Sequence, residues 1–272
     1  MARTAPIIRL EGVHKAFNGQ VVLDGVDLAV EPGKTTVVIG PSGCGKSVLL
    51  KTIIGLLRPD SGKVFFREHE ISSMPERRLD VVRRRFGFLF QGSALFDSMT
   101  VTQNVCFPLA EHGVGSPEQR RRRCREVLAM VGLADAEGSL AQKHPEELSG
   151  GQRKRVALAR AIAMDPEVIL YDEPTTGLDP IRADLINELI LRLQRSLGTT
   201  ALVVTHDLNS ARKVGDRIVM LHEGHFIVDT TPDRLGDVQD EVVARFVEGR
   251  ASPAELAELD AGHLGLAAGP DA

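Results

Sequence analysis

One stretch of this 272-residue chain constrains its fold more than any other, TTVVIGPSGCGKS at residues 35–47. Its first part is apolar and β-branched, which is typical of a buried strand in a parallel sheet. Its second part fits the pattern G-x-x-x-x-G-K-[ST], in which glycines let backbone N–H groups approach phosphate oxygens at the start of a helix. The stretch therefore predicts a buried strand, a phosphate-binding loop, and a helix over about residues 46–57.

The loop supplies the groups that a nucleoside triphosphate needs. Lys46 is expected to hold the β and γ phosphates, and the Ser47 hydroxyl is expected to ligate Mg²⁺, which prefers hard oxygen ligands. A tight turn would explain the glycines but not the Lys-Ser pair. The loop residues predicted to bind nucleotide are Gly40, Pro41, Ser42, Gly43, Cys44, Gly45, Lys46, Ser47 and Val48.

Further functional side chains are predicted where other strands end. The run VILYDEP at residues 168–174 delivers Asp172 and Glu173 to the carboxyl edge of the sheet, where open α/β sheets bind ligands. Because successive strand residues point to opposite sides, we expect Asp172 to approach Mg²⁺ and Glu173 to act as general base for the attacking water. His206, after the strand ALVVT, is expected to contact the γ phosphate, and Gln91, after FGFLF, to sense Mg²⁺ or the lytic water. The plain alternatives are a strand-end cap and a buried core histidine.

The rest of the chain alternates between strand and helix patterns. Short β-branched runs at residues 7–10 and 21–30 flank Asn18-Gly19, which is a strong signal for a two-residue hairpin turn. Residues 76–163 are mainly helical in pattern and are interpreted as containing an inserted helical subdomain. The apolar strands that follow lie at residues 168–174, 200–206 and 217–228. Their alternation with helices implies right-handed crossovers and a parallel sheet.

Composition and charge exclude several classes of protein. The net charge is -4, so the arginine runs at residues 83–85 and 120–123 are interpreted as solvated helix faces rather than as a nucleic-acid surface. No window approaches the roughly 20 apolar residues of a membrane span, so any membrane role is expected to come through a partner. Cys44, Cys106 and Cys124 are odd in number and form no C-x-x-C pair, so we interpret them as small hydrophobic residues in a reducing compartment.

Two more motifs complete an ordered set. LSGGQRKR at residues 148–155 and GLDP at residues 177–180 accompany the phosphate loop, the Gln after a strand, VILYDEP and the strand-end His. This set resembles the nucleotide-binding subunit of ATP-binding cassette (ABC) transporters over about residues 7–235. The resemblance implies a P-loop NTPase (RecA-like) fold of the α/β class, with a parallel-sheet core, an antiparallel β subdomain and an inserted α-helical subdomain. It also implies an ATPase that uses ATP and Mg²⁺.

The same resemblance implies a head-to-tail dimer with two ATP molecules between its subunits. The LSGGQ motif then binds the γ phosphate that the other chain holds, by N–H groups and a hydroxyl at the start of a helix. A capped helix with a glycine turn is the plain alternative. The GLDP loop crosses the dimer interface, and an aromatic residue of the first hairpin stacks on adenine. Nucleotide-binding residues implied in this way are Phe17, Ser149, Gly150, Gly151, Gln152 and Asp179. Since the chain has one copy of each motif, the working unit needs two copies of it or a related second chain, and a homodimer is expected.

Residues 87–109, GFLFQGSALFDSMTVTQNVCFPL, are similar to the Mla-type phospholipid-trafficking ATPases. The chain departs from that group at Gln103 within this stretch, where Glu is usual, and at Gln152 in the LSGGQ motif, where Met is expected. This similarity implies a peripheral ATPase on the cytoplasmic face of the inner membrane. Its implied partners are an integral-membrane permease and a membrane-anchored lipid-binding protein of the MCE type. The alternatives are an ABC transporter for another solute and a regulatory ABC ATPase that moves no substrate. Apolar residues predicted to dock a permease helix are Leu95, Phe96 and Met99.

The sequence also predicts how the chain is divided. We expect the nucleotide-binding domain over residues 1–238, with the helical subdomain inserted at about residues 92–163. An extension over residues 239–272 is expected to be partly helical and then disordered. The pattern of VQDEVVARFVEG, at residues 238–249, predicts one amphipathic helix, and residues 251–260 predict a weaker one.

Overall fold

The structure, a computed structural model, describes residues 5–133, 138–251, 253, 256 and 257. The chain divides into two compact units, with the boundary between Pro232 and Asp233. The domain boundary expected at residue 238 stays a prediction. None of the described helices is both long enough and apolar enough to cross a membrane.

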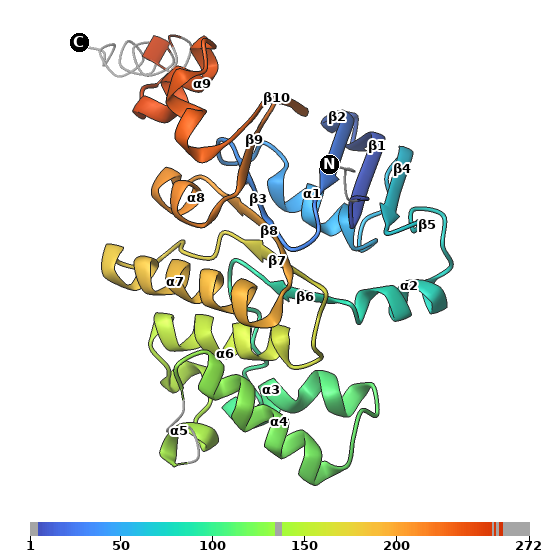
Figure 1. Ribbon diagram of the computed structural model, residues 1–272, viewed down its shortest axis with the longest axis vertical. Coiled ribbons are helices and arrows are strands. Elements are labelled where there is room, and N and C mark those ends of the chain that lie inside the picture. The colour runs from blue at the N-terminus through green and yellow to red at the C-terminus, as the bar shows by residue number, and fades with distance from the viewer. Residues whose placement is uncertain (1–4, 134–137, 252, 254–255, 258–272) are drawn as a thin grey trace, which may run out of the picture. The chain divides into compact units, whose positions relative to one another are not determined.

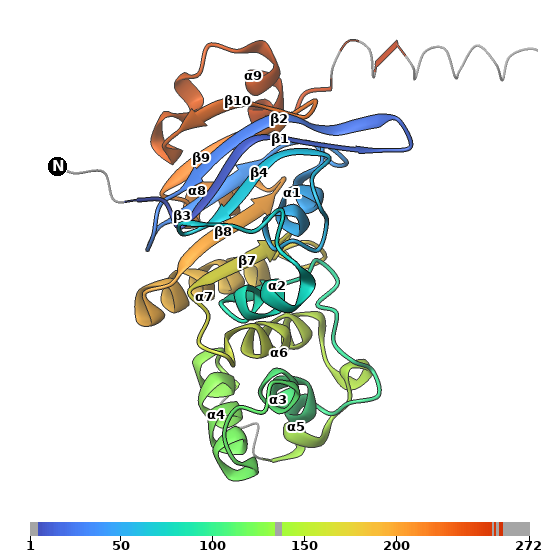
Figure 2. The same ribbon diagram turned by 90° about the vertical axis from the view of Figure 1, so that its right-hand side faces the viewer.

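The larger unit contains two β-sheets, which Figures 1 and 2 show from two directions. One is antiparallel, in the order β2-β1-β4-β5, and the other has the order β10-β9-β3-β8-β7-β6 and is parallel except at β10. The strands are β1 (Ile8–Phe17), β2 (Gln20–Val30), β3 (Thr35–Ile39), β4 (Ser61–Phe66), β5 (His69–Glu70), β6 (Phe86–Leu89), β7 (Val168–Asp172), β8 (Thr200–Thr205), β9 (Arg217–His222) and β10 (His225–Thr230). This arrangement confirms the expected parallel core and antiparallel β subdomain.

Most helices of the larger unit fall into three groups. Helix α1 packs on β7 and β8 of the parallel sheet and on β4 of the antiparallel sheet, so the main apolar core lies between the two sheets. Helices α7 and α8 lie together, with α8 against β3 and β8, while α3 to α6 gather at one end of the unit, at the bottom of Figure 1. The helices are α1 (Lys46–Ile53), α2 (Glu76–Arg83), α3 (Val101–Glu111), α4 (Pro117–Met130), α5 (Ser139–Gln142), η2 (Pro145–Glu147), α6 (Gly150–Ile162), α7 (Pro180–Leu197), α8 (Leu208–Val214), η3 (Pro232–Asp237) and α9 (Glu241–Glu248).

Local signals set several of these elements. The predicted hairpin is confirmed, because Asn18 and Gly19 both take positive φ, as a type I′ turn requires. The single strand expected over residues 217–228 is wrong. Glu223 and Gly224 also take positive φ, so the chain reverses there and forms the antiparallel pair β9 and β10. Helix α1 ends four residues before the predicted residue 57, at Ile53.

The inserted helical subdomain is confirmed, but one expectation about it is wrong. Cys106 of α3 and Cys124 of α4 are not free thiols, since they form a disulfide with their Cα atoms 5.8 Å apart. The two helices pack against each other and bring the cysteines together across 18 positions of sequence. The argument for a reducing compartment, which rested on unpaired thiols, therefore loses its basis. Among the described cysteines only Cys44 is free.

The smaller unit contains α9, which confirms the helix predicted within residues 238–249. Asp240 caps it by accepting hydrogen bonds from the N–H groups of Val242 and Val243. The weaker helix predicted over residues 251–260 and the predicted disordered tail lie mostly outside the described residues.

Candidate active site

The phosphate loop follows β3, whose five residues are all buried, and leads into α1 at Lys46. Two of its glycines are required by close approaches. A Cβ atom at Gly40 would lie 2.3 Å from the carbonyl oxygen of Leu221, and one at Gly45 would lie 2.8 Å from Val22 Cγ1. Gly45 also has φ of 103°, a backbone conformation that residues other than glycine rarely adopt. A side chain at either position would therefore collide with neighbouring atoms, so only glycine fits there.

A pocket of about 440 Å³ opens beside this loop. Its lining residues are Phe17, Gln20, Val22, Ser42, Gly43, Gly45, Lys46, Ser47, Val48, Gln91, Glu173 and His206. Segments far apart in the sequence thus meet at one place. Most of the loop residues predicted from the sequence line this pocket together with residues predicted at the ends of three other strands.

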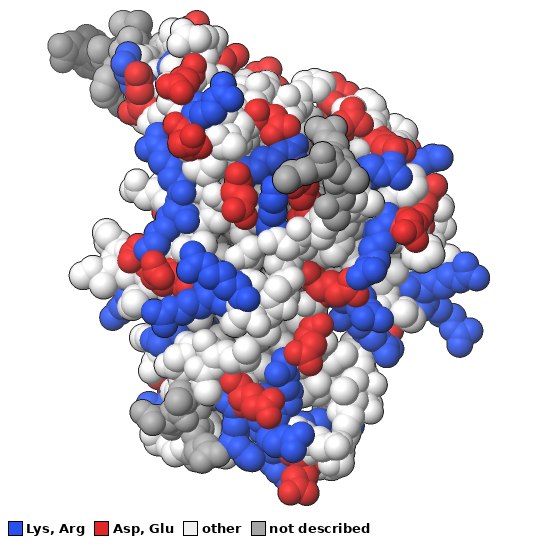
Figure 3. Space-filling view, viewed as in Figure 1, with Lys and Arg blue, Asp and Glu red and all other residues white. Residues whose placement is uncertain are grey.

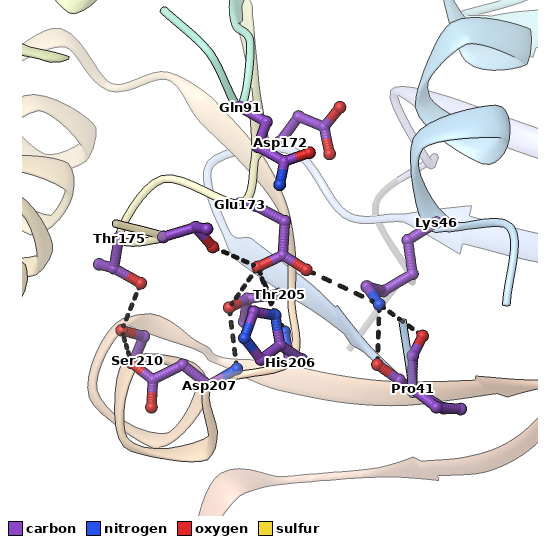
Figure 4. Close-up of polar contacts among 12 residues, drawn as sticks. Pro41, Lys46, Gln91, Asp172, Glu173, Thr175, Thr205, His206, Asp207 and Ser210 are labelled. Carbon is purple, nitrogen blue, oxygen red and sulfur yellow. Dashed lines mark hydrogen bonds and ion pairs between the residues drawn. The ribbon is translucent and has the colours of Figure 1, made fainter. Parts of the chain in front are cut away.

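Lys46 is buried and reaches along its own loop. Its Nζ donates hydrogen bonds to the carbonyl oxygens of Gly40 at 2.7 Å and Pro41 at 2.8 Å. The same ammonium lies 3.7 Å from Glu173 Oε1, as Figure 4 shows. The structure therefore places a cation between the phosphate loop and the carboxylate predicted to be the general base.

Asp172 and Ser47 are in direct contact. Ser47 Oγ donates to Asp172 Oδ1 at 2.8 Å. Burial raises the pKa of Asp172, while the Ser47 hydrogen bond opposes this shift. A hydroxyl and a carboxylate in contact are a suitable pair of hard oxygen donors for Mg²⁺. Figure 4 shows Asp172 and Glu173 pointing in different directions, as strand alternation predicts.

Glu173 is the most connected acid of the site. Its Oε2 accepts hydrogen bonds from Thr176 Oγ1 at 3.2 Å and Thr205 Oγ1 at 3.3 Å, and lies 2.9 Å from His206 Nδ1. The residue is 7% exposed, and the backbone has φ of 48°, a region that non-glycine residues seldom occupy. The carboxylate is thus held in one direction, towards the pocket.

The remaining predicted residues of the loop and the first hairpin have simpler surroundings. Cys44 is half-buried, and burial raises the pKa of its thiol. Phe17 is 41% exposed at the end of β1, and Lys15 Nζ lies 5.3 Å from the centre of its ring. Gln91 is exposed, two residues beyond the end of β6.

The LSGGQ residues form a separate group, and none of them appears among the residues lining the pocket. Ser149 caps α6 by accepting a hydrogen bond from Gln152 N at 3.3 Å, and Gln152 Oε1 accepts one from Ser149 N at 2.9 Å. Asp179 caps α7 in the same way, with Oδ1 accepting from Arg182 N at 3.0 Å. A Cβ added at Gly150 would lie 3.7 Å from Leu178, so this group lies beside the GLDP loop.

Three contacts of Glu173 were not foreseen from the sequence. Thr176 and Thr205 hold its carboxylate, and Lys154 Nζ donates to its carbonyl oxygen at 3.2 Å. The threonines carry no local signal of this role. Lys154 does carry a signal in the sequence. Its spacing from Gly151 and Leu158 puts this charged residue on the buried face of the helix.

An apolar groove of about 430 Å³ lies near Gln91 but outside the nucleotide pocket. Its lining residues are Arg83, Arg84, Phe86, Gly87, Phe88, Phe90, Ala94, Phe96, Phe107, Pro108, His112, Arg160, Ala161 and Met164. Of the three residues predicted to dock a permease helix, Phe96 lines this groove and is 41% exposed, whereas Leu95 and Met99 are half-buried and lie outside its lining. The ring of Phe96 packs on Phe107 with centroids 4.7 Å apart.

Comparisons with known proteins agree with this geometry. The family model described as ABC transporter matches residues 23–176. The probable ribonucleotide transport ATP-binding protein mkl of Mycobacterium tuberculosis is 39% identical over 270 residues, which span 94% of this chain and 74% of that protein. The intermembrane phospholipid transport system ATP-binding protein MlaF of Haemophilus influenzae is 40% identical over 245 residues, which span 90% of this chain and 91% of that protein.

A solved structure is similar as well. The dimeric, post-hydrolysis state of the ATP-binding cassette MJ0796, bound to ADP and Pi, superposes with a TM-score of 0.76 at 36% identity. The match covers 83% of this chain and 98% of that one.

Proposed function

The chain belongs to the ABC transporter family, and from that premise we propose that this ATP-binding subunit powers phospholipid trafficking between membranes through a partner permease. The observation that carries its ATPase chemistry is the meeting of Lys46, Glu173 and His206 at one pocket. Family membership supports ATP hydrolysis coupled to transport as the activity.

In the proposed mechanism the phosphate loop and Lys46 bind the β and γ phosphates. Ser47 and Asp172 would hold Mg²⁺, which neutralises charge on the phosphate oxygens when bound. Lys46 exchanges part of its hydrogen bonding with Gly40 and Pro41 for the phosphates. Because the amide N–H groups at the start of α1 also point towards the loop, the positive end of the helix favours the same anion.

Glu173 is proposed as the general base. The hydrogen bonds from Thr176 and Thr205 fix its Oε2, so that the carboxylate faces the pocket where the γ phosphate and the attacking water would lie. His206 is proposed to contact the γ phosphate from the same side, and Gln91 to sense Mg²⁺ or the water. A positioned base of this kind typically contributes about 10²–10⁴-fold to a rate.

The working unit is proposed to be a homodimer. Ser149, Gly150, Gly151, Gln152 and Asp179 are assigned to the nucleotide held by the other chain, because they lie outside the lining of their own chain's pocket. The start of α6, which Ser149 caps, provides N–H groups for an anion there, as the start of α1 does in the phosphate loop. The dimeric state of the related MJ0796 cassette supports this assembly.

A permease helix is proposed to dock in the groove lined by Phe96. The groove combines five phenylalanines with Arg83, Arg84 and Arg160, and therefore suits an amphipathic helix with acidic residues at its edge. The loop that carries Phe96 also carries Gln91, which lines the nucleotide pocket, so docking and hydrolysis share one segment. A peripheral place on the cytoplasmic face of the inner membrane, beside a permease and an MCE-type lipid-binding protein, completes the proposal.

Phospholipid is the proposed cargo because residues 87–109 are similar to the Mla-type ATPases and because MlaF is a relative with nearly full mutual coverage. The name of the mkl relative, which refers to ribonucleotide transport, favours a second candidate, an ABC transporter for another solute.

The test is purification of the native complex, with lipid analysis, from cells that carry the natural chain or Phe96→Asp. We expect the natural complex to contain a permease and bound phospholipid. The Asp variant should lose the permease while it keeps ATP binding, because a partner helix that covers the groove would have to bury the charged Asp side chain among aromatic rings. Val114→Asp, at an exposed apolar residue outside the groove lining, is the control and should keep the permease. A natural complex without phospholipid rejects the cargo, and normal assembly of Phe96→Asp rejects the docking site.

A further inference from the structure

One buried cation on α6 has no role in the mechanism described so far. Lys154 is 5% exposed and lies on the face of the helix that also buries Gly151, Ala157 and Leu158. Desolvation lowers its pKa, although the nearby charges of Asp172 and Glu173 oppose the shift. Burial of an ammonium group is unfavourable unless strong partners compensate for the lost water. Its partners therefore identify what it does.

Both partners are backbone carbonyls at the carboxyl edge of the parallel sheet. Lys154 Nζ donates to the carbonyl oxygen of Gln91 at 2.6 Å and to that of Glu173 at 3.2 Å. Gln91 lies just beyond β6, and Glu173 directly follows β7. One side chain of the helix that begins with the LSGGQ residues thus joins the two segments that carry the proposed water sensor and the proposed base.

The contact with Glu173 bears on the direction of its carboxylate. The backbone of Glu173 has φ of 48°, its N–H donates to the carbonyl oxygen of Val204 at 3.0 Å, and its carbonyl accepts from Lys154. Both polar groups of this peptide segment are therefore anchored. Since a left-handed conformation is unfavourable for a residue with a side chain, it persists only where such contacts hold it. Lys154 supplies one of them.

A second cation of α6 holds the same loop further along. Arg160 Nη2 donates to the carbonyl oxygen of Ser93 at 3.1 Å, and its guanidinium lies 5.5 Å from the centre of the Phe96 ring. The segment from Gln91 to Phe96 is thus attached to α6 at two points. A displacement of α6 consequently moves both the segment and the Glu173 carbonyl.

We propose that Lys154 is a positioning residue for ATP hydrolysis, which fixes the carbonyls of Gln91 and Glu173 and so couples the direction of the Glu173 carboxylate to the position of α6. The proposal rests on the proposed role of Glu173 as general base. Lys154 does not line the nucleotide pocket, so it acts through Glu173 and not on ATP. When Ser149, at the start of α6, engages the nucleotide of the partner chain, Lys154 transmits that engagement to the base.

The test compares Lys154→Met with Arg155→Met in the full chain. Methionine keeps the length of the lysine stem but removes the donors, and Arg155 is the neighbouring cation, which donates to the carbonyl oxygen of Gly132 away from the pocket. Because misplacement of a catalytic group lowers the chemical step more than binding, we expect Lys154→Met to lower kcat at least about tenfold while KM for ATP changes less than about threefold. Arg155→Met should leave both within about twofold. Lys154→Arg, which keeps charge and donors, should recover part of kcat.

A second comparison separates positioning from a merely structural role. If Lys154 acts through Glu173, adding Lys154→Met to Glu173→Gln should lower the residual rate by less than about threefold, because the two effects are not additive. An unchanged kcat in folded Lys154→Met, or a full additional loss in the Glu173→Gln background, would each overturn the proposal. If the Met variant does not fold, the same measurements on Lys154→Gln decide the question. If Glu173→Gln alone leaves turnover normal, the assignment of the base fails instead.

Discussion

Single residues of the site depend on contacts that are far apart in sequence. Strand alternation was enough to predict that Asp172 and Glu173 point to different partners, because it is a property of the strand alone. Alternation was not enough to predict which groups hold Glu173. Thr205 comes from β8, the neighbouring strand of the sheet, and Lys154 comes from helix α6. The sequence could therefore predict that Glu173 lies at the pocket, but it could not predict the contacts that hold this side chain.

The first prediction concerns Glu173 itself. Glu173→Gln keeps the size of the side chain and the phosphate loop but removes the base, so we expect turnover to fall by at least about a hundredfold while ATP affinity stays nearly normal. Affinity and turnover should be measured on the same preparation. Asp184→Asn, at an exposed acid of α7 that pairs with Lys213, is the control and should turn over normally. Near-normal turnover of Glu173→Gln would show that another group is the base.

At the scale of elements, continuous patterns were predictive and chain reversals were less so. The strands β3, β7 and β8 are entirely buried, which is why their uninterrupted apolar runs indicated a parallel core. The Asn-Gly turn between β1 and β2 was found because its residues favour positive φ, whereas the Glu223-Gly224 turn was missed because glutamate does not. The bond between α3 and α4 depends on how these helices pack, and the spacing of the cysteines does not reveal it.

The second prediction concerns that disulfide. It closes a loop across 18 positions of sequence, and a cross-link of this span typically stabilises a fold by about 2–4 kcal/mol, chiefly by restricting the unfolded chain. We therefore expect reductant to lower the denaturant midpoint of the protein. The double variant Cys106→Ser, Cys124→Ser should unfold at the lower midpoint with or without reductant, and Cys44→Ser should respond like the natural chain. Equal midpoints of the natural chain in both conditions would contradict the bond's contribution.

At the scale of the whole molecule, the larger unit has two helix starts that the sequence predicts to bind phosphate, and they do not share a pocket. The phosphate loop opens α1, and Ser149 opens α6 beside the GLDP loop. Charges of both signs are interspersed over the face in Figure 3. That face therefore has no broad positive patch that would attract a nucleotide by charge alone. In a head-to-tail dimer, the start of α1 in one chain and the start of α6 in the other chain would face the same nucleotide. The sequence predicted this head-to-tail arrangement through the resemblance that its ordered motifs carry.

The most direct test is a two-chain complex in which one chain carries Lys46→Ala and the other carries Ser149→Arg, each with its own tag and both in the Glu173→Gln background, which slows hydrolysis. ATP trapped by the isolated mixed dimer is counted, with both single-variant homodimers as controls. If Lys46 of one chain and Ser149 of the other build each site, the mixed dimer retains one complete site and traps one ATP, whereas the homodimers trap none. If each chain serves its own nucleotide, both chains are defective and the mixed dimer traps none, which contradicts the shared-site account.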